Sequence, residues 1–236
     1  MHVTYIEHSS FAVTLEKHIL LFDYFRGELP ELDKSKDMIV FFSHVHPDHY
    51  SHKCFDFFVP SSKLNMVLSS DIWKKDQSFL KQKREEGYQI HVMSAHDTMQ
   101  VEDGQISTLK STDEGVAFLI KLEDRTIFHA GDLNWWHWMG ESKAYNTNMA
   151  ANFKREIDHL RNQKIDLAFF PLDPRLEEAS GYGPDYFIQK TNTTSLIPMH
   201  CWDQYEVIDQ YKLNSNVVSK TKIVSVTHKG EQFEID

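Results

Sequence analysis

A short segment in the first quarter of the chain is rich in side chains that can bind metal ions. Residues 43–50 read SHVHPDHY, in which His44, His46, Asp48 and His49 offer imidazole nitrogen and carboxylate oxygen, which bind zinc and related divalent ions. On a turn, His44 and His46 can point to one side while Asp48 and His49 point to another. One loop could then supply ligands to two metals that lie a few ångströms apart. Such a distance between two metals suits hydrolysis with a shared hydroxide. The chain has 14 histidines, but the full H-x-H-x-D-H pattern at a strand end favours a metal site over a histidine-rich surface loop.

The neighbouring residues place this segment where a strand gives way to a helix. Residues 38–42 read MIVFF, and this short apolar run of β-branched and aromatic residues predicts an inner strand. Residues 50–55 are expected to begin a helix. Because ligand sites in layered α/β folds form at the carboxyl ends of strands, such a loop is a suitable place for a metal centre.

Two later strands are also predicted to end at candidate ligands. The apolar strand 126–129 leads through small residues to Asp132, where the backbone can pass close to another group and a carboxylate can bridge two cations. The strand 194–199 leads to His200. The sequence therefore suggests one centre assembled from distant segments.

The pattern of apolar residues predicts an alternation of strands and helices along the chain. Strands are expected at 3–8, 11–15, 19–24, 38–42, 65–69, 90–92, 105–110, 116–122, 126–129, 165–170, 194–199, 221–226 and 232–235. Helices are expected at 70–86, 145–162, from Pro184 onward and at 207–213. Such an alternation indicates an α/β protein.

Length and composition fit one sizeable domain over residues 1–236. Hydrophobic residues make up 41% of the chain, with 16 Phe and 5 Trp, so a substantial core is available. The formal net charge of −10 argues against charge-driven nucleic-acid binding, and two cysteines give no disulfide framework. We expect a cytoplasmic protein without a membrane partner, because neither a signal region nor a membrane-length apolar run is present.

These motifs resemble the metallo-β-lactamase superfamily, over nearly the whole chain. The resemblance looks closest to the branch that contains the ascorbate-phosphate lactonase and many metal-dependent hydrolases. It implies an αββα sandwich of four layers with the metals at one edge, and a bridging role for Asp132. It also implies that His8 and Asp23 lie near the metals without binding them. The ligands that the resemblance implies are His44, His46, Asp48, His49, Asp132 and His200.

The sequence departs from the family pattern at one ligand of the first metal. The family supplies a further histidine between the first motif and the bridging aspartate, but residues 110–115 read KSTDEG. Asp113 or Ser111 could bind instead, His137 could reach in, or the protein could hold a single metal on Asp48, His49, Asp132 and His200. We expect one or two divalent ions, with zinc first and Mn²⁺ as the choice that an oxygen ligand would favour.

Aromatic residues and an arginine suggest how a substrate pocket is built. Trp135 and Trp136 follow the Asp132 turn and form either a pocket wall or a hydrophobic plug, and the wall is the preferred interpretation. Arg175 could add charge near the glycines at 181–183, a weak anion-binding signal for which a structural turn is the preferred interpretation.

The function predicted from these features is metal-dependent hydrolysis. A metal-activated hydroxide would attack a small ester, lactone or phosphoester, and Asp48 would orient that hydroxide or take its proton. The alternative is a non-catalytic metal- or ligand-binding protein, for which the missing histidine is the best support. The expected partner is a small-molecule substrate, and a homo-oligomer is left open.

Overall fold

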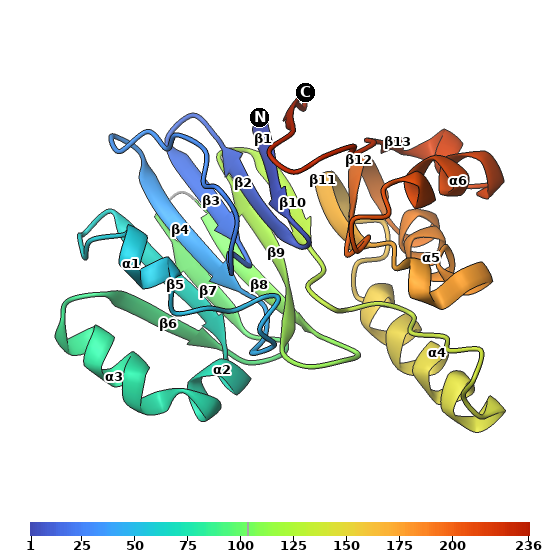
Figure 1. The fold of residues 1–236 in the computed structure, drawn as a ribbon, viewed down its shortest axis with the longest axis horizontal. Coiled ribbons are helices and arrows are strands. Elements are labelled where there is room, and N and C mark those ends of the chain that lie inside the picture. Colours follow the sequence, from blue (N-terminus) through green and yellow to red (C-terminus); the bar gives the residue numbers. More distant parts are fainter. Residues whose placement is uncertain (103) are drawn as a thin grey trace.

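Two β-sheets form the centre of the computed structural model, which describes residues 1–102 and 104–236 (Figure 1). The first sheet has seven strands in the order β14-β1-β2-β3-β4-β5-β6, and the second has seven in the order β13-β12-β11-β10-β9-β8-β7. Helices α1 to α3 lie with the first sheet and helices α4 to α6 with the second. The predicted αββα sandwich of four layers is confirmed.

The strands are short and mostly buried. The first sheet contains β1 (His2–Glu7), β2 (Ser10–Thr14), β3 (His18–Phe22), β4 (Asp37–Phe42), β5 (Leu64–Ser69), β6 (Gln89–Met93) and β14 (Gln232–Glu234). The second contains β7 (Thr98–Val101), β8 (Gly104–Lys110), β9 (Val116–Leu122), β10 (Arg125–His129), β11 (Lys164–Pro171), β12 (Asn192–Met199) and β13 (Lys222–Ile223).

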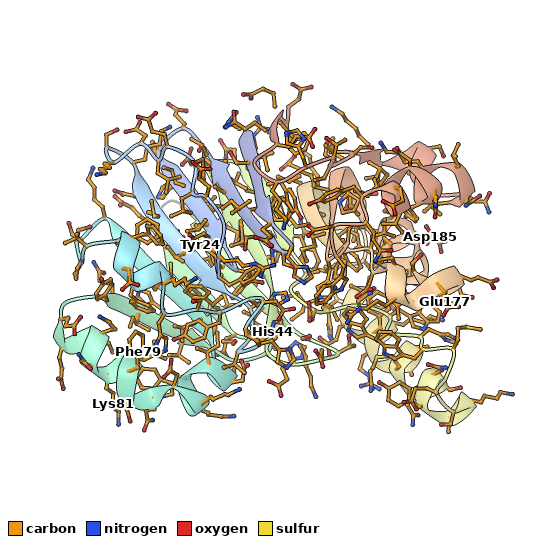
Figure 2. The ribbon with its side chains drawn as sticks, in the orientation of Figure 1. Tyr24, His44, Phe79, Lys81, Glu177 and Asp185 are labelled. Carbon is orange, nitrogen blue, oxygen red and sulfur yellow. The ribbon has the colours of Figure 1, made fainter. Side chains whose placement is uncertain are left out.

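The helices connect the strands. They are α1 (Cys54–Phe57), α2 (Ser70–Lys75), α3 (Gln77–Glu85), α4 (Lys143–Asp158), α5 (Tyr182–Lys190) and α6 (Glu206–Asn214), with 3₁₀ turns η1 (Pro174–Ala179) and η2 (Val218–Lys220). Figure 2 shows Tyr24 on the helix-covered side of the first sheet, where its ring lies 5.7 Å from Phe57, and shows Glu177 and Asp185 among the helices of the second.

Alternation along β3 explains why both of its faces are apolar. Leu20 and Phe22 belong to the core between the sheets, whereas Leu21 belongs to a separate core with Ile72 of α2 and Leu80 of α3. Because successive strand residues point to opposite faces, a strand buried on both faces has a continuous apolar sequence.

Aromatic rings join the two sheets near the edge that carries the candidate ligands. Phe11 of β2 lies 4.2 Å, between ring centroids, from Phe169 of β11. Phe22 of β3 stacks on His129 of β10 at 4.8 Å and an interplanar angle of 2°. These contacts set the two sheets at a fixed spacing beneath the loops that follow β4 and β10.

Parallel pairing brings the important strand ends together. β3, β4, β5 and β6 pair in parallel in the first sheet, and β10, β11, β12 and β13 pair in parallel in the second. Parallel strands have their carboxyl ends at the same edge of a sheet, so the segments after β4, β10, β11 and β12 meet at that edge.

Three local expectations were wrong, and one strand was missed. The helix expected from residue 50 begins at Cys54, after a turn. The helix expected over 70–86 is divided at Asp76, which has φ −122° and accepts a hydrogen bond from the Tyr50 hydroxyl at 2.8 Å. The strand expected over 221–226 pairs only at Lys222–Ile223, and the strand Thr98–Val101 was not predicted.

Within the described residues, each helix is too short or too polar to cross a lipid bilayer.

Candidate metal centre

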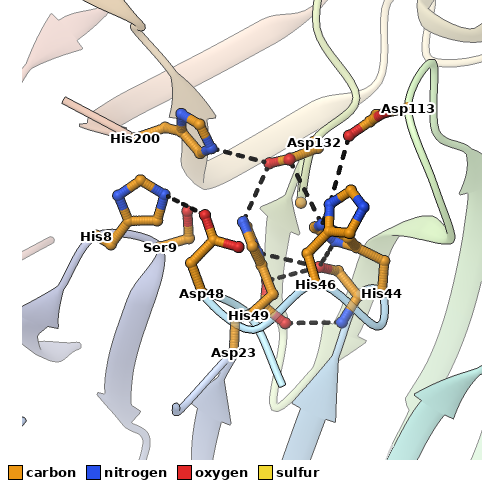
Figure 3. Close-up of polar contacts among 12 residues, drawn as sticks. His8, Ser9, Asp23, His44, His46, Asp48, His49, Asp113, Asp132 and His200 are labelled. Atoms are coloured by element: carbon orange, nitrogen blue, oxygen red, sulfur yellow. Dashed lines mark hydrogen bonds and ion pairs between the residues drawn. The ribbon is translucent and has the colours of Figure 1, made fainter. Parts of the chain in front are cut away.

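The candidate ligands come from five segments and meet at one edge of the sandwich (Figure 3). The segments are the β1–β2 turn, the loop after β4, the β8–β9 turn, the loop after β10 and the residue that follows β12. Their ligand atoms form two neighbouring groups, and within each group all atoms lie within 4.8 Å of one another.

The first group contains His44, His46, Asp113 and Asp132. His44 Nε2 lies 3.0 Å from His46 Nδ1 and 3.5 Å from Asp132 Oδ2. His46 Nδ1 lies 3.6 Å from Asp113 Oδ2. Asp113, from the β8–β9 turn, thus lies where the sequence lacks a histidine, and it can offer an oxygen in place of nitrogen.

The second group contains His8, Asp48, His49 and His200. His8 Nε2 lies 3.4 Å from Asp48 Oδ2. His49 and His200 direct their Nε2 atoms toward Asp132 Oδ1, at 3.3 Å and 3.5 Å. His8, which the sequence placed near the metals but outside their ligands, lies among the potential ligands of this group.

Asp132 lies between the two groups. Its Oδ2 faces His44 of the first group, while its Oδ1 faces His49 and His200 of the second. The Asp132 side chain is 7% exposed. This is the arrangement that a carboxylate shared by two cations requires.

Unpartnered buried atoms test whether this arrangement fits metal ions. His8 Nε2, His49 Nε2 and Asp132 Oδ1 are buried and have no hydrogen-bond partner among the described residues. A buried polar atom without a partner costs free energy, typically about 1–3 kcal/mol. Because these three atoms come from the second group and the carboxylate beside it, a cation there would satisfy them together. The residues fit divalent ions.

Burial sets the protonation states that metal binding needs. Burial and the nearby imidazoles lower the pKa of His44 and His49 well below the usual histidine value, and burial lowers the pKa of His200 to about 4. These rings are therefore neutral ligands at neutral pH. Burial, with the nearby Asp113 and Asp48, raises the pKa of Asp132 well above its usual value.

Two further carboxylates orient the ligand histidines. Asp23 Oδ2 lies 2.8 Å from His49 Nδ1, and Asp173 Oδ2 lies 2.9 Å from His200 Nδ1. Each pair commits Nδ1 to a carboxylate and leaves Nε2 to face Asp132, which is the usual way of fixing a ligand tautomer. Burial raises the pKa of Asp23 to about 6, although hydrogen bonds from Ser43 oppose this shift.

Asp173 is a residue of the candidate centre that sequence reasoning missed. Its carboxylate also accepts hydrogen bonds from Arg175 Nε, at 2.9 Å to Oδ1, and from Trp202 Nε1 at 3.2 Å. Burial raises the pKa of Asp173, but His200 and Arg175 outweigh it, so the pKa is lowered. The available signal was its place after the predicted strand 165–170, because β11 lies beside the strand that ends at His200.

Left-handed backbone conformations occur at three of these positions. His8, Asp23 and His200 have φ values of 57°, 44° and 64°. Such values are uncommon for residues other than glycine, and they cluster at functional sites where the surroundings impose them. Hydrogen bonds between the turns help to hold them, since the backbone N–H of His200 donates to the carbonyl of His8 at 3.2 Å.

A cavity of about 330 Å³ opens beside the two groups. Trp136, Trp138, Tyr145 and Met149 form its apolar wall, and Asp48, Asp113 and Asp132 reach it from the ligand side. The Trp136 indole N–H donates to the Asp132 carbonyl at 2.9 Å, which ties the wall to the centre. Arg175 lies between Trp138 and Trp202, with its Cζ 5.6 Å and 4.5 Å from the two ring centroids.

Three residues named from the sequence lie elsewhere. His137 contacts the ring of Tyr182 at 5.6 Å between centroids and belongs to neither ligand group. Ser111 accepts a hydrogen bond from the backbone of Asp113 at 3.1 Å, so it supports that residue's turn. Trp135 packs beside Phe153 and below Lys154, and it is not among the described residues that line the cavity. The partly buried Trp135 packs against the larger hydrophobic core, whereas Trp136 lines the cavity.

Comparisons with known proteins agree with this architecture. A family model described as the β-lactamase superfamily domain matches residues 2–138. No curated protein matches the sequence.

Solved structures share the fold at low sequence identity. Igni18, a metallo hydrolase from Ignicoccus hospitalis, superposes with a TM-score of 0.63 at 14% identity and covers 100% of this chain and 99% of its own. YhfI of Bacillus subtilis, a metallo-β-lactamase fold protein, gives 0.63 at 14% identity and covers 99% of each chain. CmlA of Streptomyces venezuelae, a diiron β-hydroxylase, gives 0.59 at 9% identity and covers 99% of this chain and 54% of its own.

Proposed function

Because this chain belongs to the metallo-β-lactamase superfamily, we propose that it is a metal-dependent hydrolase of a small ester, lactone or phosphoester. The observation that carries the proposal is the buried Asp132 carboxylate, which faces one ligand group with each oxygen. Two cations bound on either side of a shared carboxylate are typical of hydrolytic centres.

The proposed ligands divide between two ions. His44, His46 and Asp113 would hold the first, while Asp48, His49 and His200 would hold the second, with Asp132 shared and His8 available to the second ion. Divalent ions supply Lewis acidity, which makes water more acidic and polarises a scissile carbonyl or phosphoryl group.

Asp48 is the proposed catalytic carboxylate. Its side chain is 30% exposed and lines the cavity, so it can contact both water and substrate. Burial raises the pKa of Asp48, but the nearby His8 and His49 outweigh burial and hold the pKa below its ordinary value. A carboxylate that stays anionic is a good hydrogen-bond acceptor and a weak base, which favours orienting the attacking water over taking its proton.

The cavity supports a small substrate with an apolar part. Its volume of about 330 Å³ is at the lower end for small-molecule sites, and indole rings form much of its wall. Arg175 places a guanidinium at the rim, partly compensated by Asp173. The proposed partner is therefore a small molecule.

The proposed metal is zinc at the second position, where His49 and His200 supply nitrogen. The first position contains two carboxylates, which weakens the preference for zinc and allows Mn²⁺ or iron.

The test combines metal analysis with turnover. Purified protein should contain divalent metal by elemental analysis and should hydrolyse at least one member of a panel of lactones, carboxylic esters and phosphoesters. Asp48→Asn should lower kcat by roughly a hundredfold or more, within the usual range for a group that assists proton transfer or positioning. Asp33→Asn is the matched control, because Asp33 lies in the loop that precedes β4, at the opposite end of that strand from the ligands.

The missing histidine supports the alternative, a non-catalytic metal- or ligand-binding protein. Stoichiometric metal with no turnover on the whole panel would favour this alternative and contradict the hydrolase proposal. Turnover that is identical in wild type and Asp48→Asn would contradict the role of Asp48 alone.

A further inference from the structure

A third group of potential ligands lies on another part of the molecule. His96, Glu156 and His159 place one ligand atom each within 4.8 Å of one another. His96 belongs to the turn between β6 and β7, Glu156 to the last turns of α4, and His159 is the C-cap residue of that helix. None of the three belongs to the two groups of the main centre.

Glu156 is a buried carboxylate whose negative charge is only partly compensated by its neighbours. Its side chain is 8% exposed, and its Oε2 accepts a hydrogen bond from the backbone N–H of Lys110 at 3.1 Å. His96 Nε2 lies 3.5 Å from the same oxygen, longer than a good hydrogen bond. Glutamates are seldom buried without a partner, so this carboxylate favours a cation beside it.

The surrounding structure holds two of these side chains close to each other. Both residues contact β8. The backbone N–H of His96 donates to the carbonyl of Thr108 at 3.1 Å, and the Glu156 carboxylate accepts from the backbone N–H of Lys110. His96 has φ 66°, an uncommon value for a residue other than glycine. The backbone therefore directs an exposed imidazole toward the end of α4.

The third side chain completes a recognisable donor set. Glu156 and His159 are three residues apart at the end of α4, a spacing that puts both side chains on one face. The ring centroids of His96 and His159 are 5.4 Å apart. The carboxyl end of a helix also carries partial negative charge, which favours a cation.

We propose that His96, Glu156 and His159 bind one divalent transition-metal ion of the zinc type, separate from the main centre. Two imidazole nitrogens and one carboxylate oxygen form a ligand set that zinc accepts, with a water in the fourth position. Zinc ligands at roughly 2.0–2.2 Å stand about 3.3 Å apart in a tetrahedron. The ligand atoms of the three side chains lie within 4.8 Å of one another, somewhat farther apart than in such a tetrahedron. Rotation of the exposed imidazoles can bring them closer.

The bound ion would fasten α4 to the β6–β7 turn. α4 also supplies Tyr145 and Met149 to the wall of the cavity, at the other end of the helix. Binding at this site would thus stabilise an element that shapes the cavity, without any contact with the main centre.

The experiment measures zinc capacity in four full-length proteins: wild type, His96→Ala, His159→Ala and His2→Ala. Each is equilibrated with Zn²⁺, dialysed at fixed free Zn²⁺ and analysed for zinc per chain. His2→Ala is the matched control, because His2 also pairs with a glutamate, Glu234, at 2.7 Å but lies outside all three groups. His96 and His159 are exposed and His2 is half-buried, so the variants should fold, which circular dichroism without added metal would check.

Wild type and His2→Ala should bind one more ion than His96→Ala or His159→Ala, or the variants should bind that ion roughly tenfold or more weakly. Added Zn²⁺ should also raise Tm more in wild type than in the two variants, because an ion that binds only the folded state stabilises it. Equal zinc capacity and affinity in all four proteins would overturn the proposal. The result does not depend on turnover, so it stands or falls separately from the proposed hydrolase activity.

Discussion

Asp132 is the side chain on which the two ligand groups depend together. We expect Asp132→Ala to lose metal from both positions, because the change removes a buried carboxylate that faces both groups and leaves two cations without a shared anion. The fold should be retained, since the cores of both sheets are built from other residues. Elemental analysis and circular dichroism of the purified variant measure the two effects. Full metal occupancy in Asp132→Ala would contradict a shared role for this carboxylate.

The two groups should differ in metal affinity. In the first group the side chains of His46 and Asp113 are 38% and 45% exposed, whereas in the second those of His49 and His200 are 0% and 3% exposed. Exposed ligands are less fixed and more open to competing water. A mild chelator should therefore remove the metal of the first group first and leave a one-metal protein.

The variant Asp113→His directly tests this expected difference in metal affinity between the two groups. The change restores a nitrogen ligand at the position where the family pattern has one, so it should strengthen zinc binding in the first group and narrow the difference between the two metals. The measurement is zinc per chain against chelator concentration for both proteins. If wild type loses both metals together, or loses the metal of the second group first, the difference in exposure does not set the order.

Residue types and spacing predicted which side chains gather at the edge, but not how each one is paired. The loop after β4, Asp132 and His200 were all named from the sequence, and the structure brings them together. Asp173 was missed because its partner His200 is 27 positions away and follows a different strand. Such a contact depends on which strand ends are neighbours, and local sequence does not contain that information.

The β8–β9 turn at the metal edge depends on glycine. Gly115 has φ +69°, and a Cβ built there would lie 2.0 Å from the carbonyl oxygen of Ser43, the residue before His44. We expect Gly115→Ala to lower the free energy of unfolding by about 1–3 kcal/mol, because the left-handed backbone and the close contact both oppose a side chain. It should also weaken metal binding in the first group, since the β8–β9 turn carries Asp113.

Gly140→Ala is the matched control for this change. A Cβ at Gly140 would meet nothing within 4 Å, and this glycine does not have a positive φ. Urea unfolding of wild type and both variants, followed by metal analysis, tests the expectation. Equal stability of Gly115→Ala and Gly140→Ala would show that the β8–β9 turn can move away from Ser43 without cost.

Hydrophobic periodicity predicted most helices and strands. It failed where a tertiary contact defines an element or its bounds. The buried strands β4, β9 and β11 have mostly apolar sequences and were all predicted. The exposed edge strand β7 reads TMQV, which has little apolar signal, and its pairing with β8 defines it as a strand. The helix is divided at Asp76, whose side chain accepts a hydrogen bond from Tyr50, a residue distant in sequence.

At the scale of the whole molecule, resemblance predicted the αββα architecture, whereas composition and periodicity alone indicated only an α/β protein. The difference is physical, because apolar strands pair equally well in many orders. The packing of one sheet on the other likewise depends on contacts such as the stacking of Phe22 on His129, which join segments more than a hundred residues apart. The same long-range pairing assembles the candidate centre from five segments.

A buried carboxylate also joins the two sheets through their turns. Glu123, in the β9–β10 turn, accepts hydrogen bonds from the backbone N–H of Lys17 at 3.0 and 3.1 Å and lies 2.6 Å from His18 Nδ1, at the β2–β3 turn. The side chains of His18 and Glu123 are 9% and 10% exposed. Burial raises the pKa of Glu123, but these hydrogen bonds outweigh burial, so its pKa in the folded protein is lower than the ordinary 4.5.

This lowered pKa predicts an acid-sensitive contribution to stability. Between the folded and the unfolded pKa of Glu123 the unfolded chain binds more protons, so the contribution is fully present above pH 4.5 and is lost as pH falls through the folded pKa. We expect Glu123→Gln to lower the free energy of unfolding at pH 7 by about 1.5–3 kcal/mol, the usual size for hydrogen bonds to a charged group. Asp124→Asn is the control, because it removes a carboxylate from the same turn and asparagine tolerates the left-handed φ of 59° found there.

Urea unfolding from pH 7 downward should show the Glu123→Gln curve approaching wild type below pH 4.5, while Asp124→Asn stays parallel to wild type. A Glu123→Gln deficit that is constant over the whole pH range would mean that the glutamine loses packing or geometry, and that the charge of Glu123 does not join the sheets.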